Sequence, residues 1–106
     1  MTGPAWPDLL TVHVTQGHID DGRPCSAEAC PIALAVTRLL LGEGSGYRVH
    51  VESGTITILA RPHHVGTGCD ALVAAWRMPG SARQFAADFD FCDPVAPFTF
   101  AAERVT

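Results

Sequence analysis

The sequence predicts an α+β fold, a two-layer sandwich in which two helices cover one face of a mainly antiparallel sheet of four to five strands. Three observations support this prediction. Several short segments alternate apolar and polar residues, as half-buried strands do. Two other segments carry apolar residues at helical spacing, and a two-residue turn joins two of the expected strands. The expected order of elements is β-α-β-β-β-α-β.

Length and charge narrow the class of protein. A chain of 106 residues with 47% hydrophobic residues has the size and apolar content of one domain, so we expect residues 1–106 to form a single unit. The net charge is −4 and the seven basic residues are scattered arginines, which makes a nucleic-acid partner unlikely. No apolar run approaches the ~18–20 residues that cross a bilayer, and the first residues do not resemble a signal peptide. The lack of lysine and asparagine is typical of a high-GC genome.

The first half of the chain predicts a strand and a helix. Residues 1–8 contain two prolines and are expected to form an irregular arm, and the alternation from Leu10 to Val14 predicts a strand. Residues 16–29 are polar and predict a loop, with one helical turn near His18–Asp21. Pro31 opens an apolar helix that extends to Leu41. One face of this helix carries four apolar residues: Ile32, Val36, Leu39 and Leu40.

A β-hairpin is the most clearly marked element. Tyr47–Glu52 and Thr55–Leu59 alternate as strands, and Ser53-Gly54 forms a two-residue turn in which glycine supplies a positive φ. If Glu52 pairs with Thr55, two valines face two isoleucines on one side of the hairpin: Val49, Val51, Ile56 and Ile58. A shift of one residue would turn all four toward water, so the register is well specified.

The second half predicts a loop, a strand, a helix and a final strand. Residues 61–70 are rich in glycine and histidine and are expected to form a flexible loop. The next strand carries alternating apolar residues: Leu72, Ala74, Trp76 and Met78. Ser81 and Gln84 have the spacing of a capping box at the start of the second helix. Its apolar stripe contains Ala82, Phe85, Ala86 and Phe89. Residues 95–101 predict the last strand, and Pro97 indicates an edge position.

Cys30-Pro31 lies where the polar loop meets the first helix, and its thiol is a candidate reactive group. Proline is favoured at the first helical position, so we expect Cys30 to be the N-cap. A thiol at that place faces unpaired amides and the positive end of the helix dipole, which lowers its pKa. One alternative is therefore a thiol-dependent enzyme with Cys30 as nucleophile and His18 or His13 as base. The competing interpretation is a small residue packed where a loop meets a helix.

Cysteine and histidine spacing allows a second alternative, a small zinc-stabilised module. Four residues separate Cys25 from Cys30, and His18 precedes them; these three residues with one further ligand would complete a site. Structural zinc sites usually need two such ligand pairs, and neither Cys69, Cys92 nor His63-His64 supplies a matching second one. We therefore expect no cofactor, and we expect Cys25 and Cys30 to remain reduced rather than to form a disulfide.

The same helix start predicts a binding site for a small anion. The amides of Cys30, Ile32 and Ala33, together with Arg23, offer positive charge to such a ligand. His13 and His50 are a second pair of candidates, since they would be neighbours on the exposed sheet face if their strands pair. These six residues are the predicted ligand-binding set.

Two blocks of sequence resemble small uncharacterised proteins encoded by bacteriophages and prophages. The first runs from Val12-His13-Val14-Thr15 through His18-Ile19 and Gly22 to Cys30-Pro31-Ile32-Ala33-Leu34-Ala35. The second contains Met78-Pro79, Phe89-Asp90 and Val95-Ala96-Pro97-Phe98. Such proteins tend to carry glycine just after the Phe-Asp pair, where this chain has Cys92. The resemblance implies an accessory protein in the cytoplasm of a bacterial host, without a particular activity.

These observations together predict a non-enzymatic binding module. Its expected partner is a host protein or a small anionic molecule, and neither nucleic acid nor a membrane. The chain is small and its sheet is expected to have a polar face or an edge strand open to a second copy, so a homodimer is a further expectation.

Overall fold

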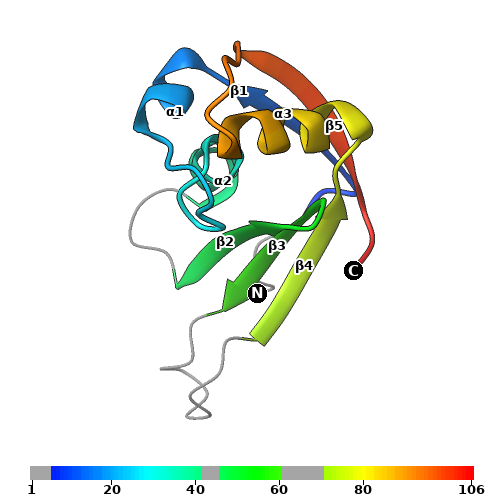
Figure 1. The fold of residues 1–106 in the computed structure, drawn as a ribbon. Helices are drawn as coiled ribbons and strands as arrows, with labels where there is room; N and C mark the ends of the chain where they lie inside the picture. The colour runs from blue at the N-terminus through cyan, green and yellow to red at the C-terminus, as the bar shows by residue number, and fades with distance from the viewer. Residues whose placement is uncertain (1–5, 42–45, 61–70) are drawn as a thin grey trace.

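The structure, a computed structural model, describes residues 6–41, 46–60 and 71–106 and shows an α+β fold built on a curled antiparallel sheet (Figure 1). Its five strands are β1 Leu9–Val14, β2 Tyr47–Glu52, β3 Thr55–Ala60, β4 Ala71–Arg77 and β5 Phe98–Arg104, in the order β1-β5-β4-β3-β2. The helices in these ranges are α1 Gln16–Asp21, α2 Pro31–Val36 and α3 Gly80–Asp90, and a π-helical segment, η1 Thr37–Leu41, continues α2. The predicted α+β class and antiparallel sheet are confirmed. The helical turn expected near His18–Asp21 is α1.

The sheet curls around α2. This helix contacts both β1 and β2, the outermost strands of the sheet, and it buries Ile32 and Val36. β4 and β5 overlap only at their C-terminal ends, where Trp76 and Arg77 lie opposite Arg104 and Glu103 and Ala75 is bonded to the residues after β5. Among the described residues, the rest of each strand has no partner in the other half of the sheet. The apolar faces of both halves are thereby turned toward one helix, which explains how so short a chain encloses a core.

α3 joins this core from the half of the sheet that β1 and β5 form (Figure 1). The ring of Phe85 stacks on that of Phe98 in β5 with centroids 4.6 Å apart, and Phe98 stacks in turn on Phe100 at 5.4 Å. Ala82 and Phe85 are buried and Phe89 packs against the core, as the predicted apolar stripe requires.

The β2–β3 hairpin has the predicted register. Glu52 pairs with Thr55, and the two valines lie opposite the two isoleucines as expected. Ser53 and Gly54 have φ values of 52° and 78°, so both central residues of the turn are left-handed, as a type I′ turn requires.

The prediction for Pro97 is wrong, because β5 lies inside the sheet between β1 and β4. Pro97 directly precedes the first residue of the strand, where its missing N–H removes no hydrogen bond from the sheet. The alternation predicted for β4 also fails at Leu72, which is 55% exposed. Ile58 pairs with Ala74 but Leu59 pairs with Leu72, so one additional residue in β4 turns Leu72 to the outer face.

The two predicted helices differ from expectation at one end each. The first becomes π-helical at Thr37, and the wider turn changes the phase of the apolar face, so that Leu39 is 50% exposed. The second begins at Gly80 after Pro79 and has no side-chain cap, so the predicted capping box of Ser81 and Gln84 is wrong. Both residues lie within the first turns of α3.

A capping box is found at α1 instead. The amide of His18 donates to Thr15 Oγ1 at 3.3 Å, and the amide of Thr15 donates to His18 Nδ1 at 3.0 Å. Gly22 ends this helix, and a Cβ at Gly22 would lie 2.7 Å from two atoms of the Pro31 ring and 2.9 Å from the His18 carbonyl oxygen. This close approach holds the end of α1 against the start of α2.

Cys92 follows the C-cap of α3 in a backbone conformation that favours glycine. Its φ is 62°, and its amide donates to the Phe89 carbonyl while the Asp93 amide donates to the Asp88 carbonyl. This pair of bonds is a Schellman motif, in which the residue after the helix cap is left-handed. The turn therefore keeps the glycine-like conformation although a side chain is present.

The N-terminal arm is attached to the sheet over the part that is described. Residues 6–8 have no regular structure, as predicted, and residues 1–5 lie outside the described residues. The carbonyl of Pro7 accepts a hydrogen bond of 2.8 Å from the indole of Trp76, which is fully buried, and Trp6 meets Trp76 edge to face. The predicted loop over residues 61–70 also lies outside the described residues.

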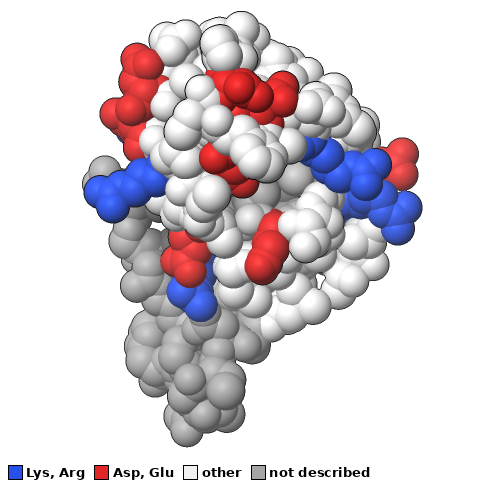
Figure 2. Space-filling model, in the orientation of Figure 1, with Lys and Arg blue, Asp and Glu red and all other residues white. Residues whose placement is uncertain are grey.

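Acidic and basic side chains on the face seen in Figure 2 form separate small groups within a larger uncharged surface. A ligand that approaches this face therefore meets both signs of charge. Within the described ranges no helix is long and apolar enough to cross a bilayer.

A substitution that adds one methyl group at Gly22 tests its close contact with Pro31. We expect Gly22→Ala to lower the free energy of unfolding by about 1–3 kcal/mol, because the new Cβ overlaps the proline ring. Gly17→Ala is the matched control, since a Cβ there has its nearest neighbour at 3.6 Å, and it is expected to be neutral or to stabilise α1 by up to about 1 kcal/mol. Urea unfolding measures both values. Equal stability of the two variants would contradict the close approach.

At Cys92, whose φ is positive, we expect a substitution to increase the stability of the fold. We expect Cys92→Gly to raise the free energy of unfolding by about 0.5–1 kcal/mol, because glycine adopts a positive φ without steric cost. Cys92→Ala keeps a Cβ and should leave the stability near that of the wild type. Thermal unfolding distinguishes the two, and an alanine variant as stable as the glycine variant would argue against strain at this turn.

Candidate functional site

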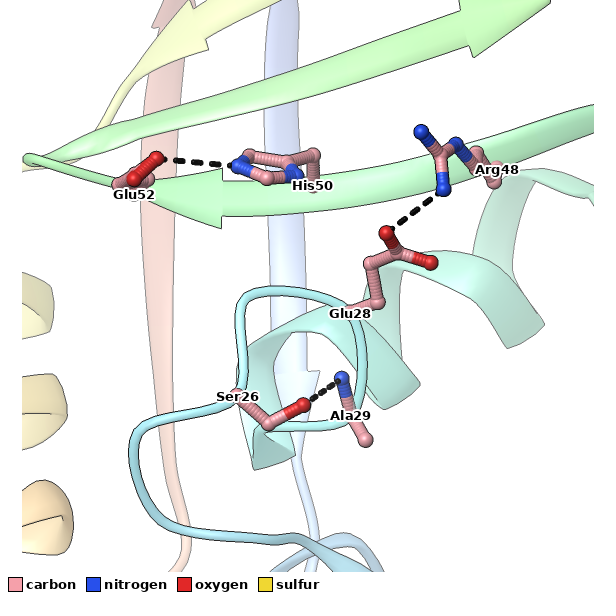
Figure 3. A network of polar contacts seen from close by, with 6 residues as sticks. All are labelled: Ser26, Glu28, Ala29, Arg48, His50 and Glu52. Carbon is pink, nitrogen blue, oxygen red and sulfur yellow. Dashed lines mark hydrogen bonds and ion pairs between the residues drawn. The ribbon is translucent and has the colours of Figure 1, made fainter. Parts of the chain in front are cut away.

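The loop between α1 and α2 is fastened to the edge strand β2 (Figure 3). The amide of Val51 donates a 2.8 Å hydrogen bond to the carbonyl of Ala27, which covers part of the open edge of β2. Beside this bond the guanidinium of Arg48 lies 2.7 Å from a carboxylate oxygen of Glu28. Both ion-pair partners are partly exposed, so the pair positions the loop more than it stabilises the fold.

The opposite side of this loop is fastened to α3. The amide of Cys25 donates to Asp90 Oδ1 at 2.8 Å, and the thiol of Cys25 lies 3.8 Å from the Asp90 carbonyl oxygen. Cys25 has a φ of 58°, a left-handed conformation that turns its amide toward the end of α3. The loop thus spans the distance between the β2–β3 hairpin and the last turn of α3.

These attachments enclose a cavity of about 520 Å³, which lies within the usual size range of small-molecule sites. Four segments form its walls: α3, the hairpin turn, the loop and the start of α2. The apolar part of the lining includes Ala27, Pro31, Ile32, Val51, Met78, Phe85, Ala86 and Phe89. The charged part consists of Glu52, Arg83 and Asp90.

Arg83 is the basic residue of this lining. A Cβ at Gly54 would lie 2.6 Å from Arg83 Cδ, so the side chain of Arg83 lies directly on the hairpin turn. Its guanidinium makes no hydrogen bond or ion pair with any residue that the structure describes. The two carboxylates do have partners: Asp90 accepts from the Cys25 amide, and Glu52 lies 3.1 Å from His50 Nε2 (Figure 3).

Cys30 is the N-cap of α2, as predicted, but its thiol is not activated. Its sulfur accepts a 3.4 Å hydrogen bond from the amide of Ala33, and the residue is 8% exposed. Burial raises the pKa of the Cys30 thiol, and the lowering effect of the nearby amides of Ala33 and Ile32 is smaller. The predicted lowering of this pKa is therefore wrong, because the helix start is buried in the core.

Neither predicted base contacts this thiol. His18 is part of the capping box, and burial, followed by the charge of Arg38, lowers its pKa, with a smaller opposing effect from Asp21. His13 hydrogen-bonds to Thr99 Oγ1 at 2.9 Å across the β1–β5 pair. Among the described residues no histidine is bonded to Cys30, so the pairing required of a thiol-dependent enzyme is not formed.

The predicted zinc ligands do not converge. Among the described residues no three side chains of histidine, cysteine, aspartate or glutamate form a group that could hold a metal ion, so His18, Cys25 and Cys30 do not form such a site. Cys25 and Cys30 are free cysteines, Cys25 exposed and bonded to Asp90 at the end of α3, and Cys30 buried as the N-cap of α2. Both line the cavity, but His18 does not.

The predicted anion-binding set is only partly assembled. Cys30 and Ile32 line the cavity, whereas Arg23 and Ala33 are not part of its wall. The amide of Ala33 is already bonded to the Cys30 sulfur, so it is not available to an anion. Arg23 is exposed on the outer side of the loop.

The proposed pairing of His13 with His50 is not formed. β1 and β2 are at opposite ends of the sheet and do not pair. His13 contacts Thr99 on β5, and His50 contacts Glu52 on its own strand. Neither histidine lines the cavity.

The sequence analysis did not identify the three charged residues of the cavity. Arg83 and Asp90 are seven residues apart and so lie on the same face of α3, which is a signal available in the sequence. That this face is directed at the hairpin turn depends on tertiary packing, and the sequence pattern does not contain it. In the sequence, Glu52 is marked only by its pairing with Thr55 in the hairpin.

No known protein family, curated protein or solved structure matches this chain. The candidate site therefore rests on its own geometry. That geometry is a cavity with an apolar floor, charged groups at its rim and one arginine available to a ligand.

The raised pKa of Cys30 predicts a loss of stability in alkali. The thiol ionises near pH 8.5 in an unfolded chain but stays protonated in the fold, so the free energy of unfolding falls as the pH rises above about 8.5. Cys30→Ser replaces the sulfur with a hydroxyl oxygen that also accepts at the N-cap and does not titrate, so its stability should depend less on pH in this range. Urea unfolding between about pH 7 and about pH 10 measures the difference. If the free energy of unfolding falls equally with pH in both proteins, Cys30 does not have a raised pKa in the fold.

Proposed function

We propose that this chain is a non-enzymatic binding protein and that its ligand is a small anionic molecule held in the cavity beside α3. The single observation that carries the proposal is Arg83, whose stem is held on the hairpin turn at Gly54 and whose guanidinium has no partner among the described residues. A planar guanidinium binds carboxylates and phosphates with two hydrogen bonds at once.

The remainder of the lining supports a ligand with an apolar body. Buried ligand surface in small-molecule sites is mostly contacted by apolar and aromatic side chains, with a few polar groups for orientation. Ile32, Met78 and Phe85 are buried in this wall and supply such contact. The buried, protonated thiol of Cys30 supports binding rather than covalent chemistry.

The other expectations from the sequence remain proposals alongside this one. They are an accessory protein of the phage or prophage type, a location in the cytoplasm of a bacterial host, a homodimer, and a two-layer arrangement with two helices on one face of the sheet. The resembling segments supported the first two, and their glycine and proline residues have structural roles in this fold.

A host protein is the second candidate partner. The observation in its favour is Phe91, which follows α3 and is 81% exposed. Aromatic side chains, phenylalanine among them, are enriched in contact surfaces between proteins.

Ligand binding in the cavity should depend on Arg83. We expect 3-phenylpropanoate, an anion with an apolar body, to bind with an affinity that Arg83→Met lowers about fivefold, the effect of losing one partly exposed charge contact. Methionine keeps the apolar stem on Gly54. Arg77→Met is the matched control, because Arg77 is exposed on β4 and does not line the cavity. Titration calorimetry measures both.

The outcomes separate the two candidates. An equal effect of both substitutions would argue against a site at Arg83. If neither 3-phenylpropanoate nor a panel of nucleotides raises the melting temperature, the small-molecule proposal fails and the protein partner remains.

A further inference from the structure

We infer that the ligand of the cavity is a zwitterion, with its anionic group at Arg83 and a cationic amine at Asp90, separated by an apolar body. This inference rests on the proposed function and specifies the chemical class of the ligand. It follows from the way in which the charges of the cavity are placed along α3.

The wall that α3 contributes has opposite charges at its two ends. Arg83, Ala86 and Asp90 lie at positions i, i+3 and i+7, so they share one face of the helix, and all three line the cavity. Seven residues correspond to roughly 10 Å along the axis. Between the two charges the wall is apolar, with Ala86 and Phe89. A ligand along this wall meets a cation at one end and a carboxylate at the other.

Asp90 is positioned for this role by the loop. Its Oδ1 accepts the Cys25 amide at 2.8 Å, which fixes the carboxylate at the edge of the cavity. A carboxylate accepts several hydrogen bonds through its two oxygens, so the bond to Cys25 leaves acceptor capacity for an amine. The left-handed φ of Cys25, 58°, is what directs its amide at this carboxylate.

The two carboxylates of the lining weaken, without abolishing, the attraction of Arg83 for an anion that carries no amine. Arg83 is accompanied by two carboxylates, Glu52 and Asp90, and like charges near a bound anion weaken its binding. The hydrogen bond between His50 and Glu52 does not remove the carboxylate from the cavity rim. A ligand that also carries an amine converts the repulsion at Asp90 into attraction.

Three related compounds test the inference: 3-phenylpropanoate, benzylamine and 3-[4-(aminomethyl)phenyl]propanoate, which combines the two groups. We expect the zwitterion to bind the wild-type protein about three- to fivefold more tightly than 3-phenylpropanoate, the range for one exposed charge pair. Benzylamine should bind more weakly than the zwitterion, because it has no group for Arg83. Calorimetry or chemical-shift titration at low salt gives the three dissociation constants.

Two aspartates of the same helix provide a matched pair of variants. Asp90→Asn keeps an oxygen for the Cys25 amide and removes the charge, so the preference for the zwitterion over 3-phenylpropanoate should disappear. Asp88→Asn removes the same charge from a residue that bonds to Gln84 at 2.8 Å and does not line the cavity, so the preference should remain. Glu52→Gln is a second rim variant: it removes a carboxylate from the anionic end of the cavity, so it should tighten both compounds and leave the preference for the zwitterion in place.

The results distinguish this inference from the proposed function. If 3-phenylpropanoate binds through Arg83 and the added amine brings no gain, the proposed function stands and the zwitterion is refuted. If none of the three compounds binds, both fail. Equal losses of preference in Asp88→Asn and Asp90→Asn would indicate a general effect of charge and would also overturn the assignment to Asp90.

Discussion

The packing of α2 between the two outermost strands is the interaction on which the rest of this structure depends. The helix contacts both β1 and β2 and buries Ile32 and Val36, so one short helix closes a sheet whose middle is only partly paired. A chain of 106 residues has too few apolar residues to build several separate cores. Because the sheet curls around one helix, the apolar faces of both halves are buried in the same core. The position of α2 in turn depends on its start, where Cys30 caps the helix and Pro31 lies against Gly22.

The candidate site is a consequence of the loop that leads into this helix. Because α2 is buried, the loop must pass along the edge of β2 and beneath the end of α3, and it is bonded to both through Ala27 and Cys25. The space enclosed between these attachments is the cavity. The same burial explains why Cys30 is inert: the dipole and amides that would activate a thiol are outweighed by the loss of water around it.

Much of the fold was predictable where the pattern is local. The hairpin register follows from side-chain alternation and a two-residue turn, and the strand and helix segments follow from period and from Pro31. The predictions that failed concern features set by tertiary contacts or by local irregularities of the backbone. Leu72 turns outward because of a bulge against β3, Leu39 because the helix widens, and Pro97 precedes an inner strand because β5 inserts between β1 and β4.

The sequence by itself determined the class of fold, the hairpin and the cap at Cys30, because each depends on residues close together in the chain. Only the tertiary structure decided which side chains share a site. Arg83 meets the hairpin turn and Asp90 meets the loop because three separate segments pack against one face of α3. His13 and His50 are kept apart for the same reason, since the order of strands in a sheet is set by packing between distant segments and not by the pattern within any one of them.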